Sequence, residues 1–123
     1  MKFATERCQF LVDNLDLVGA TGVDDARWEH FQLAHLQSDS IFRCENKSRQ
    51  IAWSWLSAAE AMADAILDGR DSIFVSINQE EAQEKIRYAK AVYGNLILDG
   101  LPKIQRSSMT NLELDKGARL SSL

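Results

Sequence analysis

The sequence contains few cysteines, prolines and glycines. Its two cysteines, Cys8 and Cys44, form no CxxC pair and no cluster with histidine, so we expect no structural zinc site. Cys44 lies in an apolar run, where cysteine behaves as a small buried hydrophobe. One proline and six glycines in 123 residues argue against a disordered or low-complexity chain.

Long apolar runs and an excess of basic charge are also absent. No window approaches the roughly 18 apolar residues that a membrane-spanning helix needs. Charged residues interrupt the N-terminal region, which does not resemble a secretory signal, and we therefore expect a cytoplasmic protein. The net charge is −4, whereas a free-standing nucleic-acid binder is more often basic. Contact with DNA would need a local basic patch, another region or a partner, but a nucleotide site is not excluded.

The length suits one small domain. Residues 1–27 form the least regular segment, with a possible short helix over 8–18 and a glycine- and aspartate-rich turn or loop over 19–25. Apolar spacing predicts a helix over 26–37. We divide the chain into this N-terminal segment, 1–27, and a second part, 28–123.

The second part alternates strand and helix signals. "SIFRC" (40–44) predicts a strand, and a polar loop leads to an alanine-rich helix over about 54–67, which Gly69 would cap. "SIFVSI" (72–77) predicts a strand buried on both faces, followed by a helix that begins after Asn78, with Glu80 and Glu81 in its first turn. Residues 110–123 predict a hairpin that turns at Lys116-Gly117.

This order predicts an α/β fold with a parallel sheet and flanking helices, to which the C-terminal β-hairpin adds strands. Because a doubly wound sheet normally needs more strands, we expect the sheet to be incomplete. The chain would then be the beginning of a larger domain.

The loop between the first strand and its helix, "ENKSRQIAWSW" (45–55), has part of the chemistry of a phosphate-binding loop. Lys47 and Arg49 offer cations, and Ser54 offers a hydroxyl for Mg²⁺ at the start of the helix. The pattern G-x-x-x-x-G-K-[ST] nevertheless fails at three positions, and Ala52 stands where glycine is usual. The alternative is an ordinary connection, with Lys47, Arg49 and Gln50 in solvent and Trp53 and Trp55 as core anchors.

"KSRQIAWS" (47–54) resembles the deviant Walker A loop of phage terminase large subunits, the ATPases that package DNA into procapsids. Many of these have the form S-R-Q-x-G-K-[ST], of which this chain keeps Ser48, Arg49, Gln50 and Ser54. A variant of the lambda and Mu-like type moves the lysine forward as K-S-x-x-x-G-x-S. Lys47, Ser48 and Ser54 match that form, which tolerates an aromatic residue at Trp53.

The flanking segments strengthen the resemblance. "SIFVSINQEEAQEKIRYAK" (72–90) looks like the family's next strand and helix, and "LELDKGARLSSL" (112–123) looks like its hairpin. The resemblance therefore covers roughly 28–123 and implies a P-loop NTPase-like (ASCE) fold. "WEHFQLAHL" (28–36) resembles the segment with an adenine-reading glutamine, for which Gln32 is the candidate. The alternative for Gln32 is a surface glutamine on an amphipathic helix, and His30 and His35 would be surface or packing residues rather than ligands.

The resemblance implies the cofactors ATP and Mg²⁺ and a role for each matched residue. Lys47 and the amides of the loop would bind the phosphates, Ser54 would hold Mg²⁺, and Arg49 would sense or stabilise the γ-phosphate. Lys47 and Arg49 are thus the catalytic candidates. The nucleotide-binding candidates are Gln32, Lys47, Ser48, Arg49, Gln50, Ile51, Ala52, Trp53 and Ser54. The implied partners of the full-length protein are double-stranded DNA, the portal and the small terminase subunit, with a homo-oligomer only when the protein is complete.

Three acidic segments imitate the Walker B strand that supplies the Mg²⁺-binding Asp and the water-orienting Glu. "IFVSINQEE" places its acids in the first turn of a helix, "AILDG" ends the preceding helix, and "LILDG" reads as a turn. In the terminase family this motif would follow Leu123. We therefore expect negligible hydrolysis by this chain alone, and a truncated terminase. The competing interpretations are a helicase-like P-loop ATPase fragment and a non-catalytic interaction module without nucleotide binding.

Overall fold

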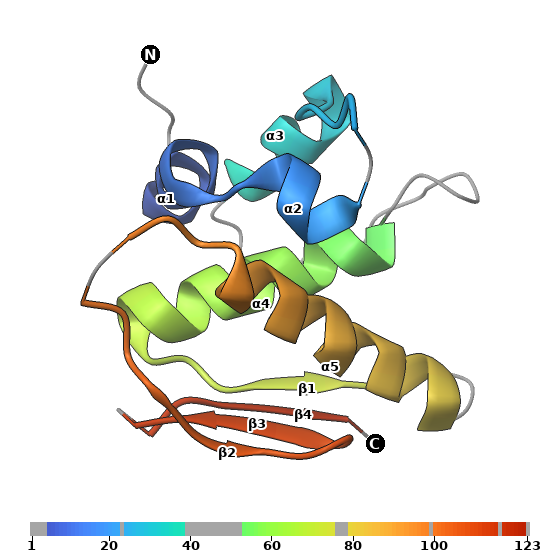
Figure 1. Cartoon of the computed structure of the whole chain (residues 1–123), viewed down its shortest axis with the longest axis vertical. Helices are drawn as coiled ribbons and strands as arrows, with labels where there is room; N and C mark the ends of the chain where they lie inside the picture. Colours follow the sequence, from blue (N-terminus) through green and yellow to red (C-terminus); the bar gives the residue numbers. More distant parts are fainter. Residues whose placement is uncertain are drawn as a thin grey trace.

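The computed structural model describes residues 5–22, 24–38, 53–75, 79–98, 100–115 and 117–122. These residues form three layers (Figure 1). Helices α4 (Trp53–Asp68) and α5 (Gln79–Gly94) form the middle layer. A four-stranded sheet covers one side of this pair, and the three N-terminal helices cover the other side.

The N-terminal layer consists of α1 (Glu6–Asn14), α2 (Leu17–Thr21) and α3 (His30–Leu36). The helix predicted over 8–18 is therefore two helices, because the Asp16 side chain accepts a hydrogen bond from the Gly19 amide and starts a new helix. The turn predicted over 19–25 is partly wrong, since α2 continues to Thr21 before Gly22 ends it with a φ of 73°. The helix predicted over 26–37 is shorter, because Glu29 is extended and forms its N-cap.

The two long helices have the predicted positions. Helix α4 ends at Asp68, and Gly69 follows it with a φ of 67°, the left-handed conformation expected of a glycine cap. Helix α5 begins at Gln79 with Glu80 and Glu81 in its first turn, where carboxylates favour the helix dipole. Asn78, its predicted N-cap, lies outside the described residues.

The sheet is mixed rather than parallel. Its strands are β1 (Ser72–Phe74), β2 (Ile104–Ser107), β3 (Asn111–Leu114) and β4 (Arg119–Ser122), in the spatial order β1-β4-β3-β2. β1 and β4 are parallel, whereas β3 pairs antiparallel with both β4 and β2. The predicted hairpin is confirmed as β3–β4, with Gly117 at a φ of 95° in its turn. β2 was not predicted from the sequence, and the strand predicted over 40–44 lies outside the described residues.

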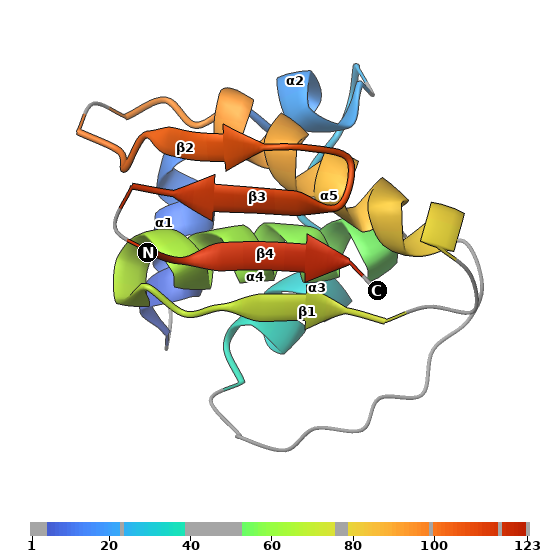
Figure 2. The same ribbon diagram turned by 90° about the horizontal axis from the view of Figure 1, so that it is seen from below.

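The prediction that the strand at 72–77 is buried on both faces is wrong. Phe74 points into the core, but Ile73 and Val75 are 64% and 69% exposed. The reason is visible in Figures 1 and 2, where every helix of the described chain lies on one face of the sheet. The opposite face has no covering layer among these residues.

The hydrophobic core lies on both sides of the α4–α5 pair. Toward the sheet it receives alternate residues of the strands, among them Leu112 and Leu120, which are directly opposite each other in the β3–β4 ladder. Toward the other side it receives Cys8 and Leu11 of α1, both fully buried. The N-terminal segment therefore shares one continuous core with the rest of the described chain.

Candidate functional site

The starts of α4 and α5 lie at one edge of the sheet. β1 and β4 run in the same direction, and their carboxyl ends point to the side on which both helices begin (Figure 2). In α/β sheets, ligands bind outside the carboxyl ends of parallel strands, because helix N-termini with free amide groups gather there. This edge is the candidate functional site.

Most of the predicted phosphate loop lies outside the described residues. This holds for Lys47, Ser48, Arg49, Gln50, Ile51 and Ala52. Trp53 and Ser54 are the first two residues of α4, so the expected start of a helix at the end of the loop is confirmed. The roles of these side chains in binding phosphate and Mg²⁺ stay predictions.

Gln32 is not the surface residue of the alternative interpretation. It is 7% exposed, and its Oε1 accepts a hydrogen bond of 2.9 Å from the backbone N–H of Glu29. Gln32 stands three residues after the N-cap, so this contact is half of a capping box that satisfies a free amide at the start of α3. A role of Gln32 in reading adenine stays a prediction. The structure shows that the same side chain caps the start of α3.

Two tryptophans connect the segment before α3 with the first turn of α4. The rings of Trp28 and Trp55 lie 5.8 Å apart between centroids and are tilted by 48°. Trp55 is 7% exposed, in agreement with the role of core anchor that the alternative interpretation of the loop gave it. Its indole Nε1 has no hydrogen-bond partner among the described residues. The side chain of Trp53 lies outside the described part of the structure.

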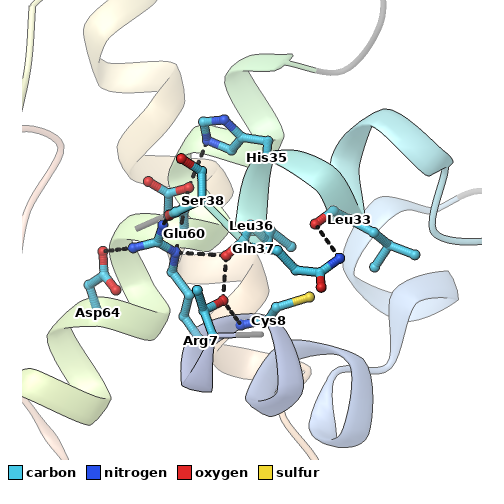
Figure 3. Close-up of polar contacts among 10 residues, drawn as sticks. Arg7, Cys8, Leu33, His35, Leu36, Gln37, Ser38, Glu60 and Asp64 are labelled. Carbon is cyan, nitrogen blue, oxygen red and sulfur yellow. Dashed lines mark hydrogen bonds and ion pairs between the residues drawn. The ribbon is translucent and has the colours of Figure 1, made fainter. Parts of the chain in front are cut away.

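The structure also reveals a buried cluster of charged side chains, shown in Figure 3, which sequence reasoning missed. Arg7 of α1, His35 of α3, and Glu60 and Asp64 of α4 form it, and we call it the Arg7 cluster. The His35 Nε2 lies 2.7 Å from the Glu60 Oε2, and the Arg7 guanidinium lies 3.9 Å from Glu60 and 3.7 Å from Asp64. His35 was predicted to be a surface or packing residue rather than a ligand, and here it packs between helices.

Arg7 also binds the C-terminal end of α3. Its Nε donates a hydrogen bond of 3.0 Å to the carbonyl of Leu36, and its Nη2 donates to the carbonyl of Ser38. The Thr5 hydroxyl donates to the same Leu36 carbonyl. These donors satisfy carbonyls that a helix end leaves without partners. One arginine therefore holds α1, the end of α3 and the middle of α4 together.

The electrostatics of the Arg7 cluster depend on burial. Burial raises the pKa of Asp64 above its ordinary value because water is removed from the carboxylate, and the neighbouring Arg7 opposes this shift. The guanidinium of Arg7 lies near both carboxylates of the cluster, those of Glu60 and Asp64.

The acids that imitate a Walker B motif occupy the positions predicted for them. Asp68 is the last residue of α4, and Glu80 and Glu81 lie in the first turn of α5. Asp99 of the third imitation lies outside the described residues. Among the described residues, no group of three or more histidines, cysteines and acids is arranged to hold a metal ion.

Comparisons of the chain with protein-family models, curated proteins and solved structures find no match. Within the described part of the chain, no helix has both the length and the apolar character needed to cross a membrane.

Proposed function

We propose that this chain is the N-terminal part of the ATPase domain of a phage terminase large subunit, with a P-loop NTPase-like fold. Residues 47–54 bind the phosphates of ATP, and the full-length protein uses its hydrolysis to move double-stranded DNA. The observation that supports this best is the start of α4 at Trp53, directly after the loop and at the carboxyl edge of the parallel β1–β4 pair.

The physical basis is the N-terminus of a long helix. The first four amides of a helix lack intrahelical partners, and the helix dipole places partial positive charge at that end. Helix α4 has 16 residues, which is long enough for the helix dipole to place its full partial positive charge at the first turn. Lys47 and Arg49 supply the cations that the phosphates require, and the Ser54 hydroxyl is the ligand for Mg²⁺.

Binding and hydrolysis have different requirements in this proposal. The Mg²⁺ ion bound with ATP supplies charge neutralisation of the phosphates. An Asp and a Glu of a Walker B strand complete the site in the full-length terminase, which also engages the portal and the small subunit. This chain therefore binds nucleotide with negligible hydrolysis.

The test is a calorimetric titration of the chain with ATP and Mg²⁺. Lys47→Ala should weaken binding at least about tenfold, which corresponds to about 1.4 kcal/mol. Lys103→Ala is the matched control, because Lys103 is exposed just before β2, and it should leave the affinity unchanged. The proposal fails if the folded wild-type chain binds no nucleotide, or if Lys47→Ala binds as tightly as Lys103→Ala.

A second candidate function is a non-catalytic interaction module. The exposed Ile73 and Val75 on the open face of the sheet favour it, since adjacent exposed apolar side chains often mark a contact surface. Such a module predicts no nucleotide binding in the same titration. If the wild-type chain binds no nucleotide and self-associates, and Ile73→Thr weakens that self-association, the results would support this second candidate.

A further inference from the structure

The open face of the sheet carries a row of charged side chains across three neighbouring strands. Arg106 of β2 is directly opposite Glu113 of β3, and Glu113 is directly opposite Arg119 of β4. The leucines on either side of Glu113 are fully buried, and side chains alternate along a strand, so Glu113 points away from the helices. Directly opposite residues share a face, and all three charged side chains therefore lie on the face that is turned toward the viewer in Figure 2.

This row borders an open hollow on the same face. The hollow has a volume of about 630 Å³, which is within the range of small-molecule binding sites. Every residue that lines it is polar or charged, namely Arg106, Ser107, Ser108, Asn111, Glu113 and Arg119. Two arginines and one glutamate give the lining a net positive charge, although the whole chain has a net charge of −4. The hollow therefore suits an anion whose remaining surface is polar.

The two arginines keep free donors beside the hollow. Arg106 is exposed, and its guanidinium has no hydrogen bond or ion pair among the described residues. Glu113 pairs instead with Arg119, whose Nε lies 3.0 Å from the Glu113 Oε1. This contact uses one N–H of Arg119 and leaves both of its Nη groups for a ligand. The charge of Glu113 is thus compensated by Arg119, and the charge of Arg106 is not compensated.

The turn between β2 and β3 adds a hydroxyl donor. The Oγ of Ser108 accepts hydrogen bonds from the backbone N–H groups of Thr110 and Asn111, at 3.3 and 3.1 Å. Because these amides occupy its acceptor positions, the hydroxyl turns its proton toward another partner. The Thr110 hydroxyl, 3.5 Å away, lies at the limit of hydrogen-bond distance, so an oxygen of a bound anion competes easily for this proton.

Donors on three sides suit a phosphate group better than a carboxylate. A phosphate monoester has three terminal oxygens, whereas a carboxylate has two. Arg106, Arg119 and Ser108 belong to β2, β4 and the turn, so each can reach a different oxygen. The hollow is larger than a phosphate group alone, and the second carboxylate oxygen of Glu113 can accept a hydrogen bond from a hydroxyl group of the ligand.

We propose that this hollow binds the phosphate of a small polar phosphomonoester, such as a sugar phosphate. Arg106 and Arg119 neutralise the phosphate, Ser108 donates a hydrogen bond to one of its oxygens, and Glu113 accepts one from a hydroxyl group of the organic part. The site shares no residue with the loop proposed to bind ATP, and the inference does not rest on nucleotide binding.

A nuclear magnetic resonance titration of the full chain tests the proposal, with the amide signals of residues 106–111 as reporters. The probes are inorganic phosphate and ribose 5-phosphate, added at about pH 7.5, where most of the phosphate is doubly charged, and at an ionic strength held constant with chloride. Both probes should shift these signals in a saturable manner. Ribose 5-phosphate should bind at least about threefold more tightly, because its sugar hydroxyls add a hydrogen bond.

Arg106→Gln should weaken the binding of both probes at least about fivefold, because it removes the uncompensated charge and its donors. Arg87→Gln is the matched control, since it removes the same charge at an exposed position of α5, on the covered side of the sheet. It should leave both affinities unchanged. Lys47→Ala should also leave these shifts unchanged, which separates this site from the proposed ATP site.

Glu113→Gln is the second variant. It keeps an acceptor for Arg119 but removes a negative charge, so inorganic phosphate should bind at least about twofold more tightly. The proposal is overturned if neither probe gives saturable shifts, in which case Arg106 only deters pairing of the edge strand. It is overturned equally if Arg106→Gln binds as tightly as Arg87→Gln, if Lys47→Ala abolishes the shifts, or if Glu113→Gln does not strengthen phosphate binding. Equal affinities for the two probes would overturn the assignment to a phosphomonoester.

Discussion

Gln32 offers the most informative perturbation, because two roles can be separated at this residue. Its Oε1 accepts a hydrogen bond from the Glu29 amide, and the proposed function adds a contact with adenine. Glutamate and glutamine are interchangeable in a capping box, since each supplies an acceptor at this position. They are not interchangeable on the adenine edge, because a carboxylate has no donor to offer.

Gln32→Ala should therefore lower the free energy of unfolding by about 1 kcal/mol, the usual cost of losing a helix cap. Gln32→Glu keeps the acceptor of the capping box, but it places a carboxylate at a site that is 7% exposed, so it should also lower the free energy of unfolding. It should bind ATP at least about tenfold more weakly, through the loss of one hydrogen bond. Urea denaturation measures the first quantity and calorimetry the second. Gln105→Ala, on the exposed strand β2, is the control and should change neither.

Two results would refute this reasoning. If Gln32→Ala keeps the wild-type free energy of unfolding, the capping contact does not stabilise α3. If Gln32→Glu keeps the wild-type affinity for ATP, the side chain does not read adenine and its role is structural alone.

Two further predictions concern stability. Leu120→Ala should lower the free energy of unfolding by about 2–5 kcal/mol, because Leu120 is fully buried between the sheet and the helices. Leu98 is 46% exposed, so Leu98→Ala should lower it by less than about 0.5 kcal/mol. Equal losses in urea denaturation would contradict the described core. Because the pKa of Asp64 is raised in the folded state, the folded chain binds a proton there more tightly than the unfolded chain does. The free energy of unfolding should therefore fall as the pH rises from the ordinary pKa of an aspartate to the raised pKa of Asp64. Asp64→Asn should flatten this fall in a series of denaturation curves, and an unchanged slope would show that Asp64 does not contribute to it.

The elements that could be predicted from the sequence are those with strong local signals. Helix α4 combines many alanines with a glycine that ends it, and α5 begins with two glutamates. The β3–β4 hairpin has alternating leucines and a glycine in its turn. In each case neighbouring residues determine the element, so no knowledge of distant contacts is needed.

Strand β2 illustrates the opposite case. Its residues, "IQRS", have no apolar alternation, and all four are exposed. The strand forms because β3 offers it an unpaired edge, and the register shifts between Ile104 and Arg106. The exposure of Ile73 and Val75 has a similar origin, since their apolar character predicts burial and the one-sided arrangement of the helices prevents it.

The Arg7 cluster could be predicted only in part. Glu60 and Asp64 are four residues apart on one helix, and like charges at this spacing destabilise a helix unless a cation lies near them. The sequence thus contained a reason to expect a positive charge beside α4. It could not identify Arg7 or His35, because both come from helices whose packing on α4 depends on the whole fold.

The candidate site at the carboxyl edge depends on the C-terminal hairpin as well as on the loop. β1 has three residues and cannot form a stable strand without a partner. Among the described strands that partner is β4, and the Arg119 amide donates a hydrogen bond of 2.9 Å to the Asp71 carboxylate at the point where the two strands begin together. The hairpin therefore fixes the direction of β1 and, through β1, the edge at which α4 and α5 start. Any ligand bound at the start of α4 should thus be sensitive to changes in β4, although β4 contains none of the residues proposed to bind it.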